Sequence, residues 1–176
     1  INDEKISKKL SEDIEEMEKM LNEYLQFASS TSSEKDELFN ISQTIKSLIE
    51  KYDNVLITSD IEKHVSFNGR KNLLLRCLSN IIDNGLKYGK HVEISFKRLN
   101  KIIVITINDD GPGIPKSEYS NVFKPFYKIN KGRGDSKSSV GLGLSIASDV
   151  VRSHGGKIDL NKSKSGGLSV KISLPF

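Results

Sequence analysis

The sequence predicts an α+β fold, a two-layer sandwich in which helices cover one face of a mixed, mostly antiparallel sheet, preceded by one long amphipathic helix. Some segments show the three- and four-residue apolar spacing of helices, and others show the alternation of strands. The strands also cluster, without a regular strand–helix alternation. With 176 residues, 36% hydrophobic and 28% charged, the chain suits one ordinary domain with an additional helix.

The first element that we expect is a helix over residues 4–28. Apolar residues recur along it in steps of three and four, Glu and Lys occupy its other faces, and no Pro or Gly precedes Gly69. One helix cannot bury such a stripe alone, so we expect it to pack against partner helices, with docking on its own domain as the alternative. The polar run at 29–36 predicts a boundary. It divides the chain into a helical segment (1–30), a linker (31–36) and a domain (37–176).

The remaining elements follow from apolar periodicity and from turn residues. We expect further helices at 41–52, 69–88, 116–122 and 143–154. We expect strands at 55–58, 92–96, 102–108, 157–161 and 168–174. The second and third of these strands pair across a short turn, and the last two pair around Gly166-Gly167.

Composition excludes several classes of function. The net charge is only +4, basic residues are interspersed with acidic ones, and there is no Trp, so we expect no nucleic-acid partner. No apolar run reaches the ~20 residues that a membrane-spanning helix needs. Cys77 lies in an apolar helical pattern and is expected in the core. The three histidines lack partners at metal-ligand spacing, and we expect structural or solvated roles for them.

One polar helical face stands out in the segment NIIDNGLKYG at 80–89. Asn80, Asn84 and Lys87 are spaced by four and three residues, which places them on one side of a helix. Two amides and an ammonium can serve a hydrated Mg²⁺ and a phosphate. A plain exposed face is the alternative, and it is the simpler reading of this segment taken alone.

A second unusual stretch, NDDGPGI at 108–114, follows a predicted strand. Asp109 ends the strand, so its carboxylate can be held rigidly and can accept a hydrogen bond from an amino group such as that of adenine. Gly111 and Gly113 have no Cβ, which lets a flat ring approach the backbone. The alternative is a tight turn with a solvated acid.

Two further patches follow along the chain. The segment FKPFYK at 123–128 sets aromatic residues around a proline, as an anchor for a mobile loop or as an edge of the core. Residues 130–140 are polar, basic and glycine-containing, a composition typical of a flexible lid. Gly141 and Gly143 then open the last predicted helix, where exposed N–H groups and the positive end of the helix dipole suit phosphate.

The order of these patches is more specific than any one of them. Here the sequence resembles the catalytic, ATP-binding part of sensor histidine kinases, in the superfamily shared with gyrase B, MutL and heat-shock chaperones. The segments at 80–89, 109–114, 123–128 and 141–144 resemble that family's N box, first glycine box, F box and second glycine box. Gly166-Gly167 resembles the last glycine box. The helix at 4–28 is similar to the second helix of a dimerisation and phosphoacceptor hairpin, as in osmosensor kinases of the EnvZ type.

The resemblance implies a Bergerat-type fold that binds ATP or ADP with Mg²⁺. Asp109 would bind the adenine amino group. Asn84, with Asn80 nearby, would hold the metal, and Lys87 and Tyr88 would contact phosphate or sugar. The nucleotide-binding set that it implies is Asn84, Lys87, Tyr88, Asp109, Gly111, Gly113, Ile114, Phe123, Lys128, Gly141, Leu142, Gly143 and Leu144. The catalytic residues that it implies are Asn80, Asn84 and Lys87.

Two departures from the family pattern bear on activity. Ser139 stands where the family often has a third glycine, which affects the geometry of the lid. No histidine of this chain stands in a phosphoacceptor motif, so the acceptor is expected on a first hairpin helix outside it. Hydrolytic relatives carry a glutamate as general base where this chain has Asn80, and slow ATP hydrolysis is therefore expected.

The resulting hypothesis is a kinase fragment of a two-component system. It would transfer the γ-phosphate to a histidine, serve a response regulator receiver domain, dimerise through helix 4–28 and the missing helix, and act on the cytoplasmic side of the inner membrane in a parent protein. The alternatives are an ATPase or clamp of the same superfamily, an anti-sigma-like serine kinase, and an inactive nucleotide-binding interaction module.

Overall fold

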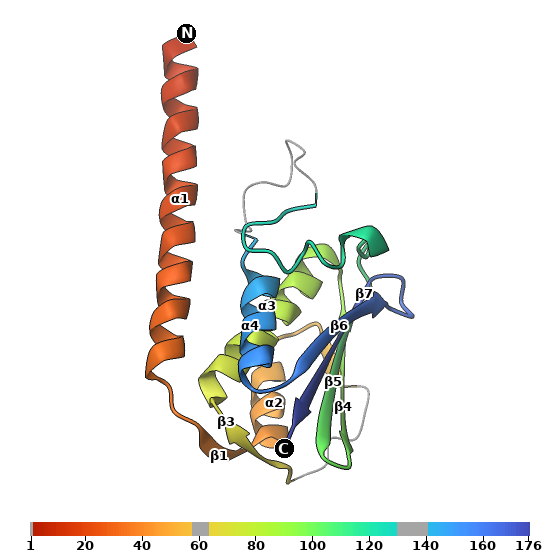
Figure 1. Ribbon diagram of the computed structural model, residues 1–176. Helices are drawn as coiled ribbons and strands as arrows, with labels where there is room; N and C mark the ends of the chain where they lie inside the picture. The colour runs from red at the N-terminus through yellow and green to blue at the C-terminus, as the bar shows by residue number, and fades with distance from the viewer. Residues whose placement is uncertain (1, 58–63, 130–140) are drawn as a thin grey trace.

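A five-stranded sheet forms one layer of the molecule, with the helices on one side of it (Figure 1). The computed structural model describes residues 2–57, 64–129 and 141–176. The strand order is β2-β4-β5-β7-β6, with β2 parallel to β4 and every other neighbouring pair antiparallel. The strands are β2 (Val55–Ile57), β4 (Val92–Leu99), β5 (Ile102–Asp109), β6 (Lys157–Lys162) and β7 (Leu168–Pro175).

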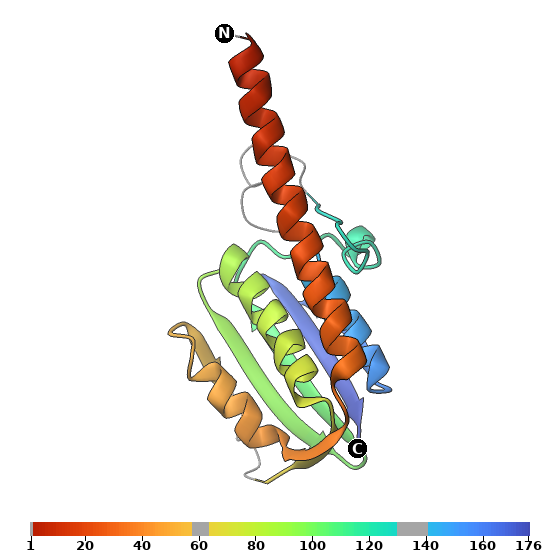
Figure 2. The same cartoon turned by 90° about the vertical axis from the view of Figure 1, so that its left-hand side faces the viewer.

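Helices cover one face of this sheet, as Figure 2 shows. They are α2 (Ile41–Ile49), α3 (Lys71–Tyr88) and α4 (Gly143–Ser153). Alternate residues of β5 (Ile103, Ile105 and Ile107) are buried beneath them, because successive side chains of a strand point to opposite faces. The buried positions of α3 likewise recur at helical spacing. This arrangement confirms the predicted α+β class, the mostly antiparallel sheet and the single helical layer.

The N-terminal helix α1 (Asn2–Ser33) runs beside the sheet and helices, and its N-terminal half extends beyond them in Figures 1 and 2. Met20 packs against the core. Most of the predicted stripe is exposed, namely Ile6, Leu10, Ile14, Met17, Leu21, Tyr24 and Leu25. No helix in the described part of the chain has the length and apolar character that crossing a membrane requires.

The helix continues further than the sequence predicts. Its expected end was residue 28, with a linker at 31–36, yet α1 reaches Ser33 through a run of Ser and Thr. These residues are only mildly unfavourable in helices, so a helix that is already nucleated can propagate through them. The non-helical connection is correspondingly short and begins at Glu34.

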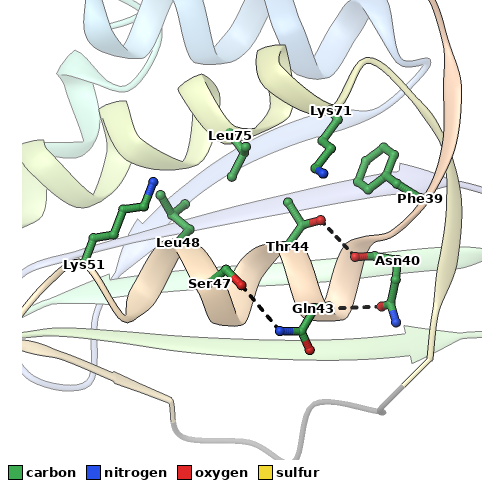
Figure 3. Close-up of a pocket in the computed structure, with 9 residues that line it drawn as sticks. All are labelled: Phe39, Asn40, Gln43, Thr44, Ser47, Leu48, Lys51, Lys71 and Leu75. Atoms are coloured by element: carbon green, nitrogen blue, oxygen red, sulfur yellow. Dashed lines mark hydrogen bonds between the residues drawn. The ribbon is translucent and has the colours of Figure 1, made fainter.

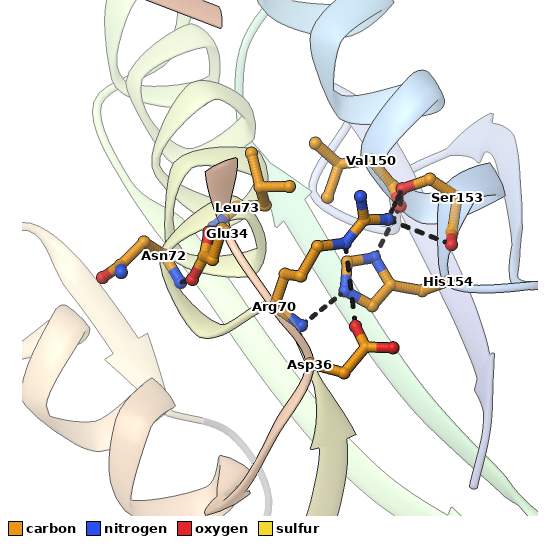
Figure 4. Close-up of polar contacts among 8 residues, drawn as sticks. All are labelled: Glu34, Asp36, Arg70, Asn72, Leu73, Val150, Ser153 and His154. Carbon is orange, nitrogen blue, oxygen red and sulfur yellow. Dashed lines mark hydrogen bonds and ion pairs between the residues drawn. The ribbon is translucent and has the colours of Figure 1, made fainter. Parts of the chain in front are cut away.

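Glu34 caps a helix that lies far along the chain. Its carboxylate accepts hydrogen bonds from the backbone N–H groups of Asn72 (2.7 Å) and Leu73 (3.0 Å), in the first turn of α3 (Figure 4). The residue at the N-cap position, Arg70, makes no capping bond with its own side chain. Glu34 therefore satisfies donors that a helix start leaves unpaired, and its charge suits the positive end of the helix dipole.

Arg70 joins the same connection to the end of α4. Its guanidinium lies 3.8 Å from Asp36 and donates to the carbonyl oxygen of Ser153 at 3.1 Å. Its backbone N–H donates to Nε2 of His154 at 3.0 Å, and Nδ1 of His154 lies 2.7 Å from the carbonyl oxygen of Val150 (Figure 4). Burial lowers the pKa of His154, in keeping with a neutral ring that accepts at one nitrogen and donates at the other. His154 thus has a structural role, as expected.

Several predicted boundaries were wrong. Two short strands, β1 (Glu37–Asn40) and β3 (Ser66–Gly69), form a separate antiparallel pair that the sequence analysis missed. The helix predicted at 116–122 is only the 3-10 turn η1 (Lys116–Glu118). Gly69 belongs to β3 rather than to α3, and α2 ends at Ile49 rather than Tyr52. Thr58, at the end of a predicted strand, lies outside the described residues.

Among the residues that the structure describes, one buried side-chain hydroxyl has no hydrogen-bond partner. Ser42 of α2 is fully buried, and its Oγ makes no hydrogen bond within the described structure. An unsatisfied buried hydroxyl costs about 1–3 kcal/mol. We therefore expect Ser42→Ala to raise the free energy of unfolding in urea by about 1 kcal/mol.

The matched control for this prediction is Ser145→Ala in α4. Ser145 is also buried, but its Oγ donates to the carbonyl oxygen of Leu142 at 2.9 Å. Both substitutions gain the same small helix propensity, so the difference between them reports the hydrogen bond. Equal changes in unfolding free energy for the two variants would contradict the prediction.

Candidate functional site

Asp109 stands at the end of β5 with one carboxylate oxygen engaged and the other available. Its Oδ1 accepts hydrogen bonds from the backbone N–H groups of Gly111 (2.9 Å) and Leu168 (3.0 Å). Within the described residues, nothing donates to Oδ2. The carboxylate is therefore held in a fixed direction by two loops and retains an acceptor for a ligand. Leu168 is predicted as the start of a strand but not as a site residue, because its contribution to the site is a backbone group.

Glycines lie close to this carboxylate, and at Gly167 there is no room for a Cβ. A Cβ on Gly167 would lie 2.0 Å from Oδ1 of Asp109 and 2.7 Å from the Gly111 nitrogen. A Cβ on Gly113, whose φ is +72°, would lie 3.3 Å from the Gly167 carbonyl oxygen. The loop after β5 and the loop before β7 thus pack backbone against backbone around Asp109. The proximity of Gly167 to Asp109 could not be read from their separation in sequence.

The polar face of α3 points at the start of α4. Nδ2 of Asn80 lies 3.4 Å from the carbonyl oxygen of Gly143. A Cβ on Gly143 would lie 3.3 Å from Nδ2 of Asn84, so a larger residue would crowd that amide. The side chain of Asn84 makes no hydrogen bond to any described residue. The structure thus brings together the two predicted amides and the predicted glycine.

Lys87 and Tyr88 lie on the last turn of α3 and are both exposed. The Lys87 ammonium lies 5.2 Å from the centre of the Tyr88 ring, a cation–π contact. The Tyr88 carbonyl oxygen would be 3.0 Å from a Cβ on Gly111. This turn therefore touches the glycine loop after β5, and its two side chains stand at the solvent edge of the site.

The aromatic segment at 123–128 is anchored by one acid. Glu118 accepts hydrogen bonds from the Tyr127 hydroxyl and from Nδ2 of Asn121. The contact with Tyr127 lowers the pKa of Glu118, and the same contact raises the pKa of Tyr127. Phe123 packs on the core, whereas Phe126 is exposed. Glu118 is not among the site residues predicted from the sequence, where its place beside an aromatic segment was the only available signal.

The same segment meets the start of the α4 region. Phe126 N–H donates to the Gly141 carbonyl oxygen at 3.0 Å. Phe126 and Gly141 both have positive φ, +63° and +77°. A Cβ on Gly141 would lie 2.9 Å from the Tyr127 carbonyl oxygen, which explains the glycine there. The predicted lid at 130–140, including Ser139, lies outside the described residues.

The remaining predicted site residues are buried or partly buried. Leu142 is buried in the core, so only its backbone faces the site, and Leu144 and Ile114 pack partly against the core. Lys128 is half-buried. Cys77 is buried as expected, and burial raises the pKa of its thiol to about 12.

A separate hollow of about 350 Å³ lies between α2 and α3 (Figure 3). Its lining comprises Phe39, Asn40, Gln43, Thr44, Ser47, Leu48, Lys51, Lys71 and Leu75. None of these belongs to the predicted site. The predicted site residues instead lie at the C-terminal ends of β5 and α3 and at the N-terminal end of α4. We take that region as the candidate site.

The residues of this region fit an adenine nucleotide. Asp109 offers a fixed acceptor between two glycine-containing loops that pack closely around its carboxylate. Asn84 offers an amide oxygen that no described residue engages. The first turn of α4 offers backbone N–H groups at a helix N-terminus, which suits phosphate. The arrangement is a candidate nucleotide-binding site that combines an amide face on a helix with glycine loops.

Comparison with known proteins identifies the family. Residues 69–176 match the family described as histidine kinase-, DNA gyrase B-, and HSP90-like ATPase. The chain belongs to this ATPase family, as the order of its motifs predicts.

Within the family, the similarity is to sensor histidine kinases, which confirms the resemblance seen in the sequence. The chain is 30% identical over 181 residues to sensor histidine kinase GtrS of Pseudomonas aeruginosa, an alignment that covers 99% of this chain and 37% of the relative. It is 35% identical over 109 residues to sensor histidine kinase CpxA of Escherichia coli, covering 61% of this chain and 24% of CpxA. The chain thus spans well under half of the length of these relatives.

Solved structures agree in fold. Mycobacterial sensor histidine kinase MprB aligns with a TM-score of 0.65 and 25% identity over 80% of this chain and 97% of that one. Full-length ShkA in complex with AMPPNP aligns with a TM-score of 0.72 and 17% identity, over 90% of this chain and 35% of that one. The likeness to ShkA concerns the fold alone.

Proposed function

We propose that this chain is the ATP-binding catalytic part of a sensor histidine kinase, which binds Mg-ATP and passes the γ-phosphate to a histidine outside this chain. One observation carries the proposal. The carboxylate of Asp109 is fixed through Oδ1 by two loops, while no described residue donates to its Oδ2. Relatives named as sensor histidine kinases support it.

In this proposal each end of the nucleotide meets a different element. Asp109 accepts the hydrogen bond of the adenine amino group, and Gly111 and Gly113 shape the loop that lies beside the ring. Lys87 and Tyr88 contact phosphate or sugar, and the backbone around Gly143 donates to phosphate. The residues proposed to line the rest of the site are Ile114, Phe123, Lys128, Gly141, Leu142 and Leu144.

Asn84 is the proposed metal residue, with Asn80 beside it. Mg²⁺ binds oxygen ligands, keeps several waters and commonly bridges substrate phosphates, so one amide oxygen suffices as the protein's contribution. When bound, the metal neutralises charge on the phosphates. Positioning and charge neutralisation carry most of a phosphoryl transfer, and this part of the chain would supply both. Because Asn80 is an amide and cannot act as a base, we expect slow hydrolysis to water.

The partners proposed for the parent protein rest on α1 and on the relatives named as sensor histidine kinases. Its exposed apolar stripe suits the second helix of a hairpin that dimerises with a helix outside this chain. The acceptor histidine would lie on that other helix, and a response regulator receiver domain would take the phosphate from it. In the parent, this part would work on the cytoplasmic side of the inner membrane.

Asn84→Ala tests the metal assignment. Wild-type chain should bind a non-hydrolysable ATP analogue more tightly with Mg²⁺ than without it, because the amide oxygen holds the metal on the phosphates. The variant should lose most of this difference, a change of about tenfold in Kd, or about 1.4 kcal/mol. Calorimetric titration with and without Mg²⁺ measures it.

The control variant is Asn161→Ala, which removes an exposed amide on β6. It should bind like the wild type in both conditions. An Mg²⁺ dependence that persists in Asn84→Ala would remove Asn84 from the metal site. Absence of any binding by the wild-type chain would overturn the proposed function itself.

A further inference from the structure

The second carboxylate of the Asp109-Asp110 pair has no role in the proposed chemistry, yet it makes more contacts than the first. Its Oδ1 accepts hydrogen bonds from the backbone N–H groups of Lys90 (2.7 Å) and His91 (2.9 Å). Its Oδ2 lies 3.2 Å from Nδ1 of His91. These contacts hold the pKa of Asp110 down at about 2, chiefly through the N–H groups of His91 and Lys90. Asp110 is thus ionised at any ordinary pH.

These contacts join two segments that meet at the candidate site. Lys90 and His91 form the turn between α3 and β4, directly after the predicted N box. Asp110 opens the loop after β5, directly after Asp109. One residue of the acidic pair therefore faces the site, and the next residue ties the loop to the end of α3.

The backbone of the two segments is close enough to require glycines. A Cβ on Gly89 would lie 2.5 Å from Oδ1 of Asp110 and 2.9 Å from the Gly111 nitrogen. A Cβ on Gly85 would lie 2.6 Å from Cγ2 of Val92, the first residue of β4. The last turns of α3 thus rest on the sheet at one point and on the loop after β5 at another. Asp110 is the charged side chain that bridges the second contact.

We propose that Asp110 is a positioning residue of the nucleotide site, which sets the adenine side (Asp109 and Gly111) relative to the phosphate side (Asn84 and Lys87). This rests on the proposed function. A nucleotide that contacts both sides binds well only if they are correctly spaced, and small misplacements in such a site are costly. An adenosine molecule, which has no phosphate, depends on the adenine side alone. Loss of the bridge should therefore weaken ATP more than adenosine.

The test compares these two ligands on Asp110→Ala and Asp110→Asn. Calorimetric titration with a non-hydrolysable ATP analogue, with adenosine as competitor, gives a Kd for each. We expect Asp110→Ala to raise the Kd of the ATP analogue about tenfold and that of adenosine less than twofold. Asp110→Asn, whose amide oxygen can still accept from both N–H groups, should recover most of the affinity.

Asp159→Ala is the matched control. Asp159 is a carboxylate on β6 that pairs with Lys157 at 2.8 Å, and it has no contact with either side of the site. It should leave both Kd values unchanged. Equal weakening of the two ligands by Asp110→Ala, or no weakening, would show that Asp110 only stabilises a turn and would overturn the positioning role.

If Asp110→Ala fails to fold, hydrogen exchange of the wild-type chain tests the same proposal. The ATP analogue should slow hydrogen exchange at the amides of Lys90 and His91 more than at the amides of β6, because binding to both sides stabilises the bridge between them. Saturating adenosine should not. Equal protection by both ligands would overturn the proposal. A wild-type chain that binds neither ligand would instead overturn the proposed function, and with it the role of Asp110.

Discussion

Asp109→Asn is expected to weaken binding of an ATP analogue by roughly 10- to 150-fold, which corresponds to the about 1.5–3 kcal/mol of a hydrogen bond to a charged group. The amide oxygen of the variant can still accept from Gly111 and Leu168, as Oδ1 of Asp109 does. The amide nitrogen then stands where Oδ2 stood and faces the adenine amino group with a second donor. Calorimetric titration measures the loss.

Two comparisons distinguish loss of the adenine contact from a general loss of structure at the site. Asp109→Ala also frees the two loops, so its binding should fall below detection. A nucleotide with a 6-oxo group, such as ITP, accepts where ATP donates, so Asp109→Asn should shift the preference from ATP towards ITP. Unchanged ATP affinity in Asp109→Asn would remove Asp109 from the adenine contact.

Gly167→Ala is expected to have the largest effect on stability. The added Cβ would lie 2.0 Å from Oδ1 of Asp109, 2.5 Å from its carbonyl oxygen and 2.7 Å from the Gly111 nitrogen. Two of these atoms belong to the backbone, and the third is held by two hydrogen bonds, so the loops must separate. We expect the free energy of unfolding to fall by about 3 kcal/mol, at the upper end for overpacking, and nucleotide binding to be lost as Asp109 moves. Urea denaturation and calorimetric titration measure the two effects.

The neighbouring glycine provides the control. Gly166 has a φ of +102°, but a Cβ there would meet nothing within 4 Å. Gly166→Ala should therefore cost only the positive φ, about 1–2 kcal/mol, and should leave nucleotide affinity nearly unchanged. If both substitutions cost the same, contact with Asp109 does not explain Gly167.

The elements that the sequence predicted well are those with a strong periodic pattern. The strand pair β4–β5 and the pair β6–β7 follow from alternation and from nearby turns, and α3 follows from its apolar spacing. The strands β1 and β3 were missed because each has four residues, and they pair with each other across a long stretch of chain. The helix predicted at 116–122 was shortened to η1, where the local chain folds around Glu118 instead.

The class of fold, the order of the motifs and the amides, acid and glycines of the candidate site could all be predicted from the residue pattern. These features depend on the local spacing of residues, which the sequence shows directly. Which atoms of these residues remain available to a ligand depends on the three-dimensional fold. It engages Oδ1 of Asp109 through Leu168, it turns Asp110 towards the end of α3, and it brings the Glu34 carboxylate to the first turn of that helix. Each of these contacts joins a side chain to a backbone N–H group, and every residue except proline has such a group, so no residue pattern could have indicated the partner.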